Sequence, residues 1–342
     1  MHPSSTDLLT EFPWLGRLAD TLGDATITAV SPLAGGACQD NFRIDGTSGG
    51  VPFRYALRSD ARSSLPGSLD RAAEAQAIRA AVAADVPTPG VCHELADLLR
   101  EGATATVLEW RDGVAIAAKV LKDPRLAAAR EALPGQLAAA LVRIHSVGPD
   151  RALSFRPSTP WSSTGEDAVE PALAFTRWNL DTLPDPYPSL ELALRWLSEH
   201  RPAPRPARLV HGDFRMGNFL VGPAGLTAVL DWEFAHWGSP AEDLGWLCVR
   251  DWRFGRLPLA AGGLTTRHAF FDAYTAAGGG PVDPAEVHWW EILGNLRWAA
   301  GAAHQTQRVL TGAEADLELL VIGRRVSEMA FEALRLIDVG AS

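Results

Sequence analysis

Short apolar runs separated by polar turns occupy the first third of the chain. Alternation of apolar and polar positions over four to eight residues is typical of strands, and clusters of glycine and small polar residues are typical of the turns between them. The sequence predicts strands over residues 27–33, 41–44, 53–58 and 105–110. A sheet-rich region is therefore expected at the beginning of the chain.

Longer apolar spacing, typical of helices, dominates the remainder. Residues 131–145 form one apolar face, made of Leu133, Leu137, Leu141 and Ile144. Within the first third, the alanine-rich stretch 69–84 also predicts a helix, which the prolines at 87 and 89 end. Further helices are predicted at 4–22 (interrupted near Pro13), 190–200, 264–277, 284–310 and 313–338.

One stretch, residues 209–233 (LVHGDFRMGNFLVGPAGLTAVLDWE), combines strand-like runs with polar ends. Two apolar runs flank a turn of glycine and proline at 222–225, which predicts a hairpin. Polar residues precede its first strand and follow its second. Because a hairpin of this length brings its ends together, we expect Asp213, Asn218 and Asp231 to converge on one edge.

Length and composition fit a globular protein with two lobes. The chain has 342 residues, of which 47% are hydrophobic and 21% charged. No apolar run approaches the ~20 residues of a membrane span, and the N-terminus lacks a signal-peptide pattern. The three cysteines, Cys38, Cys92 and Cys248, are widely spaced and odd in number. These features predict a cytoplasmic protein without a metal–thiolate cluster.

The charge balance narrows the class of partner. The formal net charge of −10 argues against nucleic acid. An acidic chain is compatible with a cationic small molecule, but acidity alone does not indicate one. The motif G-x-x-x-x-G-K-[ST] does not occur in the sequence, which excludes a P-loop enzyme. We expect a small-molecule partner, with neither nucleic acid nor membrane.

The three converging residues suit phosphoryl transfer, which needs a carboxylate to accept a hydroxyl proton and hard oxygen ligands for magnesium. Asn218 follows Asp213 by five residues, the base-to-asparagine spacing of the protein-kinase catalytic loop, and Asp231 supplies a second carboxylate. This spacing leaves the Asp213 carboxylate free beside the metal pair. Arg215 is placed to bring a cation to the transferring phosphate. The alternative interpretation is a surface hairpin with polar ends.

At HGDFRMGN (211–218) and LDWE (230–233), the sequence resembles the aminoglycoside phosphotransferase and choline kinase superfamily. The resemblance is closer to the branch that includes kinase domains fused to some acyl-CoA dehydrogenases. It implies a protein-kinase-like fold that uses ATP and Mg2+. It further implies that Asp213 is the catalytic base and that Asn218 and Asp231 bind magnesium. By the same resemblance, Asp243 braces the catalytic loop.

The resemblance also indicates where a nucleotide binds. Gly35 and Gly36 lie in a turn after the first predicted strand, where backbone N–H groups can cover phosphates, although a plain hairpin explains them equally well. Glu109, Trp110 and Arg111 are expected at the hinge between lobes, where their backbone groups meet adenine. The alternative there is a strand that simply ends in a turn.

A cation is also expected on the third strand, to hold the α- and β-phosphates of the nucleotide. Kinases carry a lysine at this position, but the only lysines here, Lys119 and Lys122, lie beyond the hinge. We predict that Arg58 replaces it and pairs with Glu74 of the following helix. The alternative is a solvent-facing arginine at a strand end.

Together, these patterns predict an α+β, bilobal protein-kinase-like fold. Its β-rich nucleotide-binding lobe covers 1–109, and its mainly helical catalytic lobe covers 110–342. The predicted function is transfer of the γ-phosphoryl group of ATP to a small-molecule hydroxyl, for which the resemblance suggests a hydroxyacyl compound. The alternatives are an aminoglycoside-type antibiotic kinase and a nucleotide-binding protein without turnover. A protein kinase is disfavoured because we find no convincing D-F-G or A-P-E signature.

The last two predicted helices bear on the acceptor. Large apolar residues on them are Trp289, Trp290, Leu293, Leu296 and Trp298, and the charges expected to face inward are Arg297, Arg324, Arg325 and Glu328. Such arginines favour an uncharged or anionic acceptor, whereas the alternative is a core of tryptophans with arginine–carboxylate pairs. Residues 147–186 are expected to form an insertion over the cleft. Glu233 either assists the metal site or faces solvent.

Overall fold

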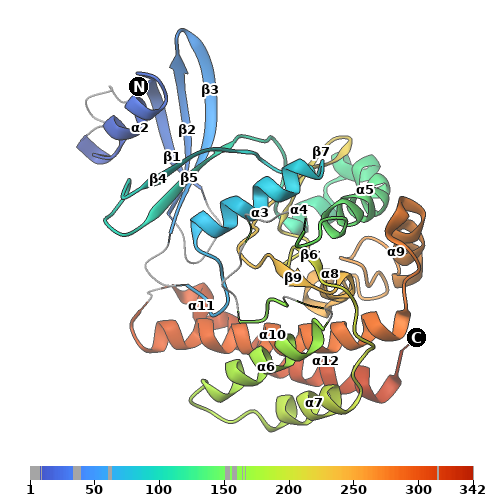
Figure 1. Ribbon diagram of the computed structural model, residues 1–342. Coiled ribbons are helices and arrows are strands. Elements are labelled where there is room, and N and C mark those ends of the chain that lie inside the picture. Colours follow the sequence, from blue (N-terminus) through green and yellow to red (C-terminus); the bar gives the residue numbers. More distant parts are fainter. Residues whose placement is uncertain are drawn as a thin grey trace.

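The structure is a computed structural model that describes residues 8, 10–33, 40–60, 64–150, 155, 160–163, 165, 167–313 and 316–341. Its N-terminal lobe is built on one antiparallel sheet with the strand order β1-β2-β3-β5-β4 (Figure 1). The strands are β1 (Thr26–Pro32), β2 (Asp40–Ser48), β3 (Val51–Ser59), β4 (Val91–Ala96) and β5 (Thr104–Glu109). All four predicted strands are confirmed. The sequence did not reveal β4, because its alternating half-buried and exposed residues form no apolar run.

Two local features shape this lobe. Gly49 and Gly50 form the two-residue turn between β2 and β3, and both have the positive φ that such a turn requires. Helix α3 (Arg71–Ala83) begins where the Asp70 side chain accepts a hydrogen bond from the backbone N–H of Ala73 at 2.8 Å. The helix packs on β4 and β5, as predicted for 69–84.

A small separate core joins the sheet to helix α2 (Leu15–Thr21). Leu15 and Leu18 of α2 are buried against Ile44 of β2 and Leu57 of β3. Helix α2 therefore confirms the part of the predicted helix 4–22 that follows the interruption near Pro13. The apolar face of the sheet explains the alternation along β2 and β3, because successive side chains of a strand point to opposite faces.

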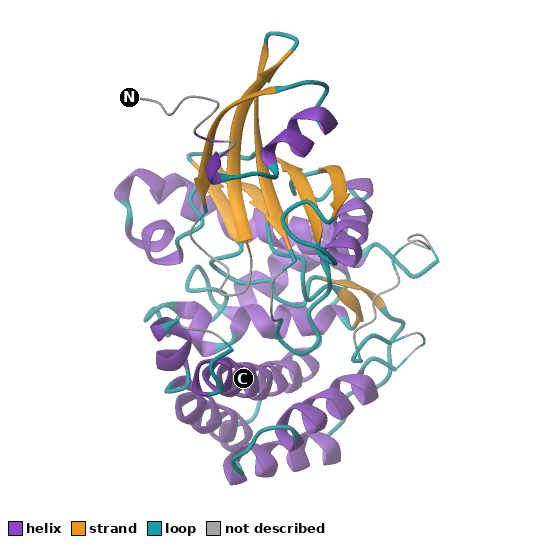
Figure 2. Cartoon of the chain, turned by 90° about the vertical axis from the view of Figure 1, so that its left-hand side faces the viewer, coloured by secondary structure: helices purple, strands orange, loops and turns teal. Residues whose placement is uncertain are grey.

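The C-terminal lobe is mainly helical, and Figure 2 shows its helices gathered beneath the sheet. Its α-helices among the described residues are α4 (Ala117–Lys122), α5 (Ala127–His145), α6 (Val169–Asp181), α7 (Pro188–Glu199), α8 (Pro240–Cys248), α9 (Arg267–Tyr274), α10 (Pro284–Leu310), α11 (Leu317–Ile322) and α12 (Arg325–Val339). Short 3-10 turns at Pro124–Leu126 and Arg250–Arg253 and a π turn at Thr275–Gly279 complete them. Trp289 and Trp290 are buried in the large core, which confirms the structural interpretation of these two residues.

Two predicted segments differ from the structure. The single helix expected at 313–338 is divided into α11 and α12, with Gly323 and Arg324 between them, and a side chain at Gly323 would collide with Thr306 of α10. The segment 147–186 contains helix α6, which packs on α7 and α10. Its helix escaped prediction because the surrounding prolines and serines mask the periodicity.

Two short sheets carry the 209–233 stretch. Strand β7 (Phe219–Gly222) pairs with β8 (Gly225–Val229), which confirms the predicted hairpin. Strand β6 (Arg208–Val210) pairs instead with β9 (His236–Gly238), a strand that the sequence did not indicate. Within the described part of the chain, none of the helices combines the length and the apolar character needed to cross a lipid bilayer.

Candidate active site

Asp243 of α8 holds the loop that follows β6 in place. Its carboxylate accepts hydrogen bonds from the backbone N–H groups of His211 at 2.8 Å and Gly212 at 2.9 Å, and it lies 3.1 Å from Nε2 of His145. Burial opposes ionisation of Asp243, but the His145 hydrogen bond and the nearby His211 outweigh it and lower its pKa. Gly212 has a positive φ and lies against the Phe234 carbonyl, so a larger residue does not fit there. The loop is therefore rigidly placed.

Asp213 and Asn218 are brought into contact by this loop. The Asn218 amide nitrogen donates to the backbone carbonyl of Asp213 at 2.9 Å and to its Oδ2 at 2.6 Å. Oδ1 of Asp213 accepts from Nε of Arg215 at 2.9 Å and from the indole N–H of Trp246 at 2.8 Å. The expectation of a free Asp213 carboxylate is wrong, because these side chains fold back onto it. Only the spacing of the motif, and not these contacts, was visible in the sequence.

Asp231 lies beside this pair, two residues after the end of β8. The backbone N–H of Leu230 donates to the Asn218 carbonyl at 2.8 Å, which ties the two ends of the hairpin together. The backbone of Asp231 has a φ of +65°, a conformation that is uncommon outside glycine. The predicted convergence of Asp213, Asn218 and Asp231 on one edge agrees with this geometry.

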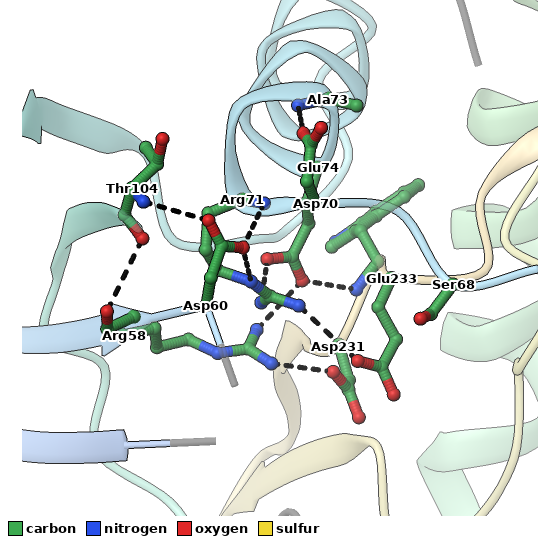
Figure 3. A network of polar contacts seen from close by, with 12 residues as sticks. Arg58, Asp60, Ser68, Asp70, Arg71, Ala73, Glu74, Thr104, Asp231 and Glu233 are labelled. Carbon is green, nitrogen blue, oxygen red and sulfur yellow. Dashed lines mark hydrogen bonds and ion pairs between the residues drawn. The ribbon is translucent and has the colours of Figure 1, made fainter. Parts of the chain in front are cut away.

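Arg58 reaches Asp231 from the other lobe (Figure 3). Its Nη2 lies 2.7 Å from Oδ1 of Asp231, and its Nη1 lies 2.9 Å from Oε1 of Glu74. Burial raises the pKa of Asp231, but the Arg58 charge and hydrogen bond reverse this effect and lower it overall. Burial likewise opposes the charge on Arg58, whose pKa is nevertheless raised by Glu74 and Asp231. The Arg58–Glu74 contact that the sequence predicted is present, and the solvent-facing alternative does not match the structure.

Arg71, which sequence reasoning missed, extends this network. It is buried in the first turn of α3, where it pairs with Glu74 and lies 3.3 Å from Oε2 of Glu233 (Figure 3). Burial and the neighbouring Asp231 raise the pKa of Glu233 to about 8, although Arg71 opposes the shift. Glu233 thus faces a charged cluster rather than open solvent. The one available signal was an arginine three residues before the glutamate on a predicted helix.

These residues surround a cavity of about 920 Å3 between the lobes. Of the predicted site residues, Arg58, Asp213, Arg215, Asn218 and Asp231 line it. Glu74 lies behind Arg58. Gly35 and Gly36 lie outside the described residues.

The predicted hinge residues do not line the cavity with their side chains. Glu109 pairs with Arg111 at 2.7 Å, and both side chains are about half exposed. The guanidinium groups of two arginines of the sheet, Arg43 and Arg54, lie 5.4 and 5.7 Å from the centroid of the Trp110 ring. Neighbouring residues such as Leu108 and Pro89 do face the cavity. Contact of the hinge backbone with adenine stays a prediction.

The two ends of the cavity differ in character. We call the end around Arg58, Arg71, Asp231 and Glu233 the nucleotide side. We call the part that is lined from α6, α10 and α11 the acceptor side; its residues are Phe175, Asn179, Arg297, Trp298, Gly301, His304, Gln305, Leu319 and Ile322. None of these residues is acidic.

Arg297 is the predicted inward-facing charge that does reach the cavity. Its guanidinium pairs with Glu242 and stacks over the rings of Trp161 at 4.1 Å and Trp246 at 5.1 Å. The expectation fails for Arg324, Arg325 and Glu328, which are exposed. They lie at the start of α12, next to the unpredicted break between α11 and α12.

Oxygen ligands for a divalent cation are available beside the Asp213 loop. Because the Asn218 nitrogen is engaged by Asp213, its amide oxygen is the atom that can coordinate a metal, and Asp231 adds a carboxylate. No group of three His, Cys, Asp or Glu residues within the described ranges forms a metal cage. Magnesium in phosphoryl-transfer sites is usually held by one or two carboxylates together with phosphate oxygens. Asn218 and Asp231 fit that requirement.

Comparison with known proteins identifies the family. The sequence profile of the phosphotransferase enzyme family matches residues 29–290, so the chain belongs to this family. A mouse relative, acyl-CoA dehydrogenase family member 10 of Mus musculus, is 26% identical over 282 residues, covering 78% of this chain and 25% of the relative. The chain thus spans about a quarter of the length of that relative. The resemblance predicted from the sequence is confirmed.

Solved structures share the fold. A candidate aminoglycoside phosphotransferase from Ralstonia eutropha JMP134 aligns with a TM-score of 0.71 at 18% identity, covering 96% of this chain and 99% of that one. Aminoglycoside phosphotransferase APH(4)-Ia, in ternary complex with AMP-PNP and hygromycin B, gives 0.62 at 19% identity and covers 94% and 97%. A choline/ethanolamine kinase family protein from Mesorhizobium loti gives 0.57 at 19% identity and covers 90% and 88%. The predicted α+β kinase-like fold is confirmed.

Proposed function

We propose that this phosphotransferase-family protein transfers the γ-phosphoryl group of ATP to a hydroxyl group of a small molecule, with magnesium as cofactor. The observation that carries the proposal is the meeting of Arg58, Asp213, Asn218 and Asp231 at one interlobe cavity. They come from β3, the loop after β6 and the two ends of the β7–β8 hairpin. A hairpin with merely polar ends gives no reason for a buried arginine from the other lobe to pair with Asp231.

Each residue has a definite task in this proposal. Asp213 accepts the proton of the acceptor hydroxyl as its oxygen attacks the γ-phosphorus. Arg58, oriented by Glu74, holds the phosphates of the nucleotide. Asn218 and Asp231 hold magnesium, which, when bound, supplies positive charge to the phosphate oxygens.

Arg215 also lies near the proposed reacting atoms. Its Nε contacts Asp213, and its guanidinium lies 4.5 Å from the centroid of the Trp252 ring, which supports the planar group from one side. A guanidinium in this place adds positive charge next to the proposed base. In this proposal, Arg215 stabilises the negative charge that builds up on the transferring phosphate.

The acceptor in this proposal is uncharged or anionic rather than polycationic. The residues of the acceptor side are aromatic, aliphatic or neutral polar, apart from Arg297. Polycationic sugars call for carboxylates that complement their ammonium groups, and none of the described residues assigned to the acceptor side carries one. Binding of hygromycin B is a property of APH(4)-Ia, and we do not carry it over to this chain. An acceptor with a substantial apolar body fits the lining of this cavity better.

The proposal is tested by ADP release from ATP and magnesium across a panel of hydroxyl compounds. The panel includes hydroxyacyl compounds, small alcohols and kanamycin-type aminoglycosides, and mass spectrometry detects the phosphorylated product. Asp213→Asn serves as the matched inactive protein. ATP-dependent thermal stabilisation without any phosphorylated product would instead indicate a nucleotide-binding protein without turnover. Efficient phosphorylation of aminoglycosides at micromolar concentration would reverse the assignment of acceptor class.

A further inference from the structure

Trp246 contributes an indole N–H to the proposed catalytic base. It lies on α8, its ring is buried, and its Nε1 is 2.8 Å from Oδ1 of Asp213. The same helix also carries Asp243, which holds the loop backbone. One helix therefore anchors both the main chain and the side chain of the loop that contains Asp213.

The Trp246 ring is confined by its neighbours. Its centroid lies 5.6 Å from that of Trp252, and the Arg297 guanidinium lies 5.1 Å above it. On the α10 side, a Cβ added to Gly294 would approach the ring to 3.2 Å, so the glycine leaves the ring its space. A ring enclosed in this way cannot turn its N–H away from Asp213 without moving its neighbours.

The two carboxylate oxygens of Asp213 accept different numbers of hydrogen bonds. Two N–H groups, those of Trp246 and Arg215, point to Oδ1, whereas Oδ2 accepts from Asn218. A carboxylate oxygen has two lone pairs in its plane, so these two donors fill the capacity of Oδ1. Oδ2 retains capacity for one more donor.

We propose that Trp246 is a positioning residue that fixes the Asp213 carboxylate so that Oδ2 receives the acceptor proton. The inference rests on the proposed kinase function. In the step itself, the acceptor oxygen forms a bond to the γ-phosphorus and its proton passes to Oδ2. The bond from the γ-phosphorus to the bridging oxygen breaks, and its electron pair leaves with ADP. An indole N–H suits this task because it only donates and carries no charge of its own.

Two substitutions separate the N–H group from the bulk of the ring. Trp246→Phe keeps an aromatic ring but removes the donor. Trp246→His is smaller, yet Nε2 of an imidazole occupies the same place in its five-membered ring as Nε1 of indole. Packing alone predicts that phenylalanine is the better substitute, whereas the positioning role predicts that histidine is.

A matched control changes a tryptophan whose N–H makes no such contact. Trp290 of α10 is buried outside the cavity, and its Nε1 has no hydrogen-bond partner among the described residues. Trp290→Phe therefore measures the cost of the same substitution in the same core. Melting temperatures of all three variants show whether each one folds.

The assay follows ADP release from ATP and magnesium with water as acceptor, so that no acceptor needs to be known. Trp246→Phe is expected to lower kcat about tenfold, the effect of losing one hydrogen bond to a charged group, while the KM for ATP stays unchanged. Trp246→His should recover most of this loss, and Trp290→Phe should stay within about twofold of the wild type. A Trp246→Phe variant with wild-type kcat, or a histidine variant slower than it, overturns the proposal.

A crystal structure of Trp246→Phe keeps the inference separate from the proposed function. If the wild type releases no ADP with water or any panel compound, the kinase assignment fails, but the orientation of Asp213 can still be examined. A carboxylate rotated away from its wild-type plane supports the positioning role. A carboxylate unchanged in orientation contradicts it, whatever the activity.

Discussion

The nucleotide side and the acceptor side of the cavity differ in the interactions that form them. On the nucleotide side, Arg58, Glu74 and Asp231 form ion pairs across the two lobes, and Arg71 extends the chain of charges to Glu233. On the acceptor side, helix faces supply rings and aliphatic chains, and Arg297, the cation among its described residues, is already paired with Glu242. Charged groups constrain the position of a ligand tightly, whereas an apolar wall constrains mainly its shape.

This difference predicts how the two sides respond to substitution. A change on the nucleotide side leaves a buried charge without its partner, which costs more than the lost contact itself. A change on the acceptor side, at residues other than Arg297, alters only the space and the apolar area offered to the acceptor. Nucleotide-side variants should therefore affect ATP use and folding together, and acceptor-side variants should affect acceptor use alone.

The largest effect is expected at Asp213, where the two sides meet. Asp213→Asn keeps the size of the side chain and an oxygen for Trp246 and Arg215, but its amide cannot take a proton. Removal of a general base typically lowers turnover by roughly 10²–10⁴-fold. Steady-state ADP release measures the loss, and AMP-PNP titration should show binding close to that of the wild type. Near-normal turnover in this variant would contradict the assignment of Asp213 as the base.

The sequence predicted the nucleotide side far better than the acceptor side, and the reason lies in chain distance. Asn218 and Asp231 flank the β7–β8 hairpin, and Asp213 lies only five residues before Asn218, so their spacing along the chain already predicts their meeting. Arg58 and Glu74 belong to a strand and the helix that follows it, and the family resemblance predicted their pairing, but the contact of Arg58 with Asp231 was not predicted. The acceptor side has no comparable local pattern.

The acceptor side is formed by residues that are far apart in the sequence. Phe175 comes from α6, a helix hidden in the proline-rich segment 147–186, and Leu319 and Ile322 come from α11, which the sequence merged with α12. Trp246 was likewise invisible, because its contact with Asp213 depends on how α8 packs under the loop. Only the inward position of Arg297 was anticipated there.

The second-largest effect is expected at the proposed magnesium ligands. Asp231→Ala removes a charge as well as an oxygen and takes away the Asp231 partner of Arg58, so it should raise the magnesium requirement by roughly a hundredfold. Asn218→Ala should raise it less, because only a neutral oxygen is lost. Magnesium titrations of nucleotide binding compare the two.

Asp231→Asn is the matched control for these titrations, since it keeps the size of the side chain and an oxygen ligand while removing the charge. Its magnesium requirement should lie between those of the wild type and Asp231→Ala. An unchanged magnesium dependence in both alanine variants would show that the metal is held elsewhere.

A smaller loss is expected when the ion pair between the lobes is broken. Arg58→Ala should weaken ATP use by roughly 1.5–3 kcal/mol, the value of a lost charged hydrogen bond. Arg58→Lys should recover only part, because a single ammonium cannot match the fork that spans Glu74 and Asp231. KM for ATP and kcat/KM are the quantities to measure, and wild-type values in Arg58→Ala would show that other groups hold the phosphates.

Glu74 tests whether this pair acts as a unit. Glu74→Ala should weaken ATP use in the same direction but less, and the double variant should lose less than the sum of the two. The structure adds a consequence, because Glu74 also pairs with buried Arg71 and accepts the backbone N–H of Trp232 at 3.1 Å. Its removal should therefore lower the melting temperature more than Arg58→Ala does, and equal melting temperatures would contradict this role.

The smallest effect, and the one that isolates the acceptor side, is expected at Gly301 of α10. Gly301 lines the cavity, and a Cβ added there would meet no atom within 4 Å. Gly301→Leu should occupy part of the acceptor side without touching the charged residues of the nucleotide side. We expect the acceptor KM to rise by a factor of roughly five to ten, as for the loss of about 1 kcal/mol of apolar contact.

Gly301→Ala is the control, because it replaces a helical glycine with a better helix former and should stabilise the protein by roughly 0.5–1 kcal/mol while adding little volume. ADP release with water as acceptor, and the KM for ATP, should be the same in both variants and the wild type. If Gly301→Leu weakens ATP use as much as acceptor use, the two sides are not separable and the nucleotide extends toward α10. If it changes neither, the acceptor binds away from this wall of the cavity.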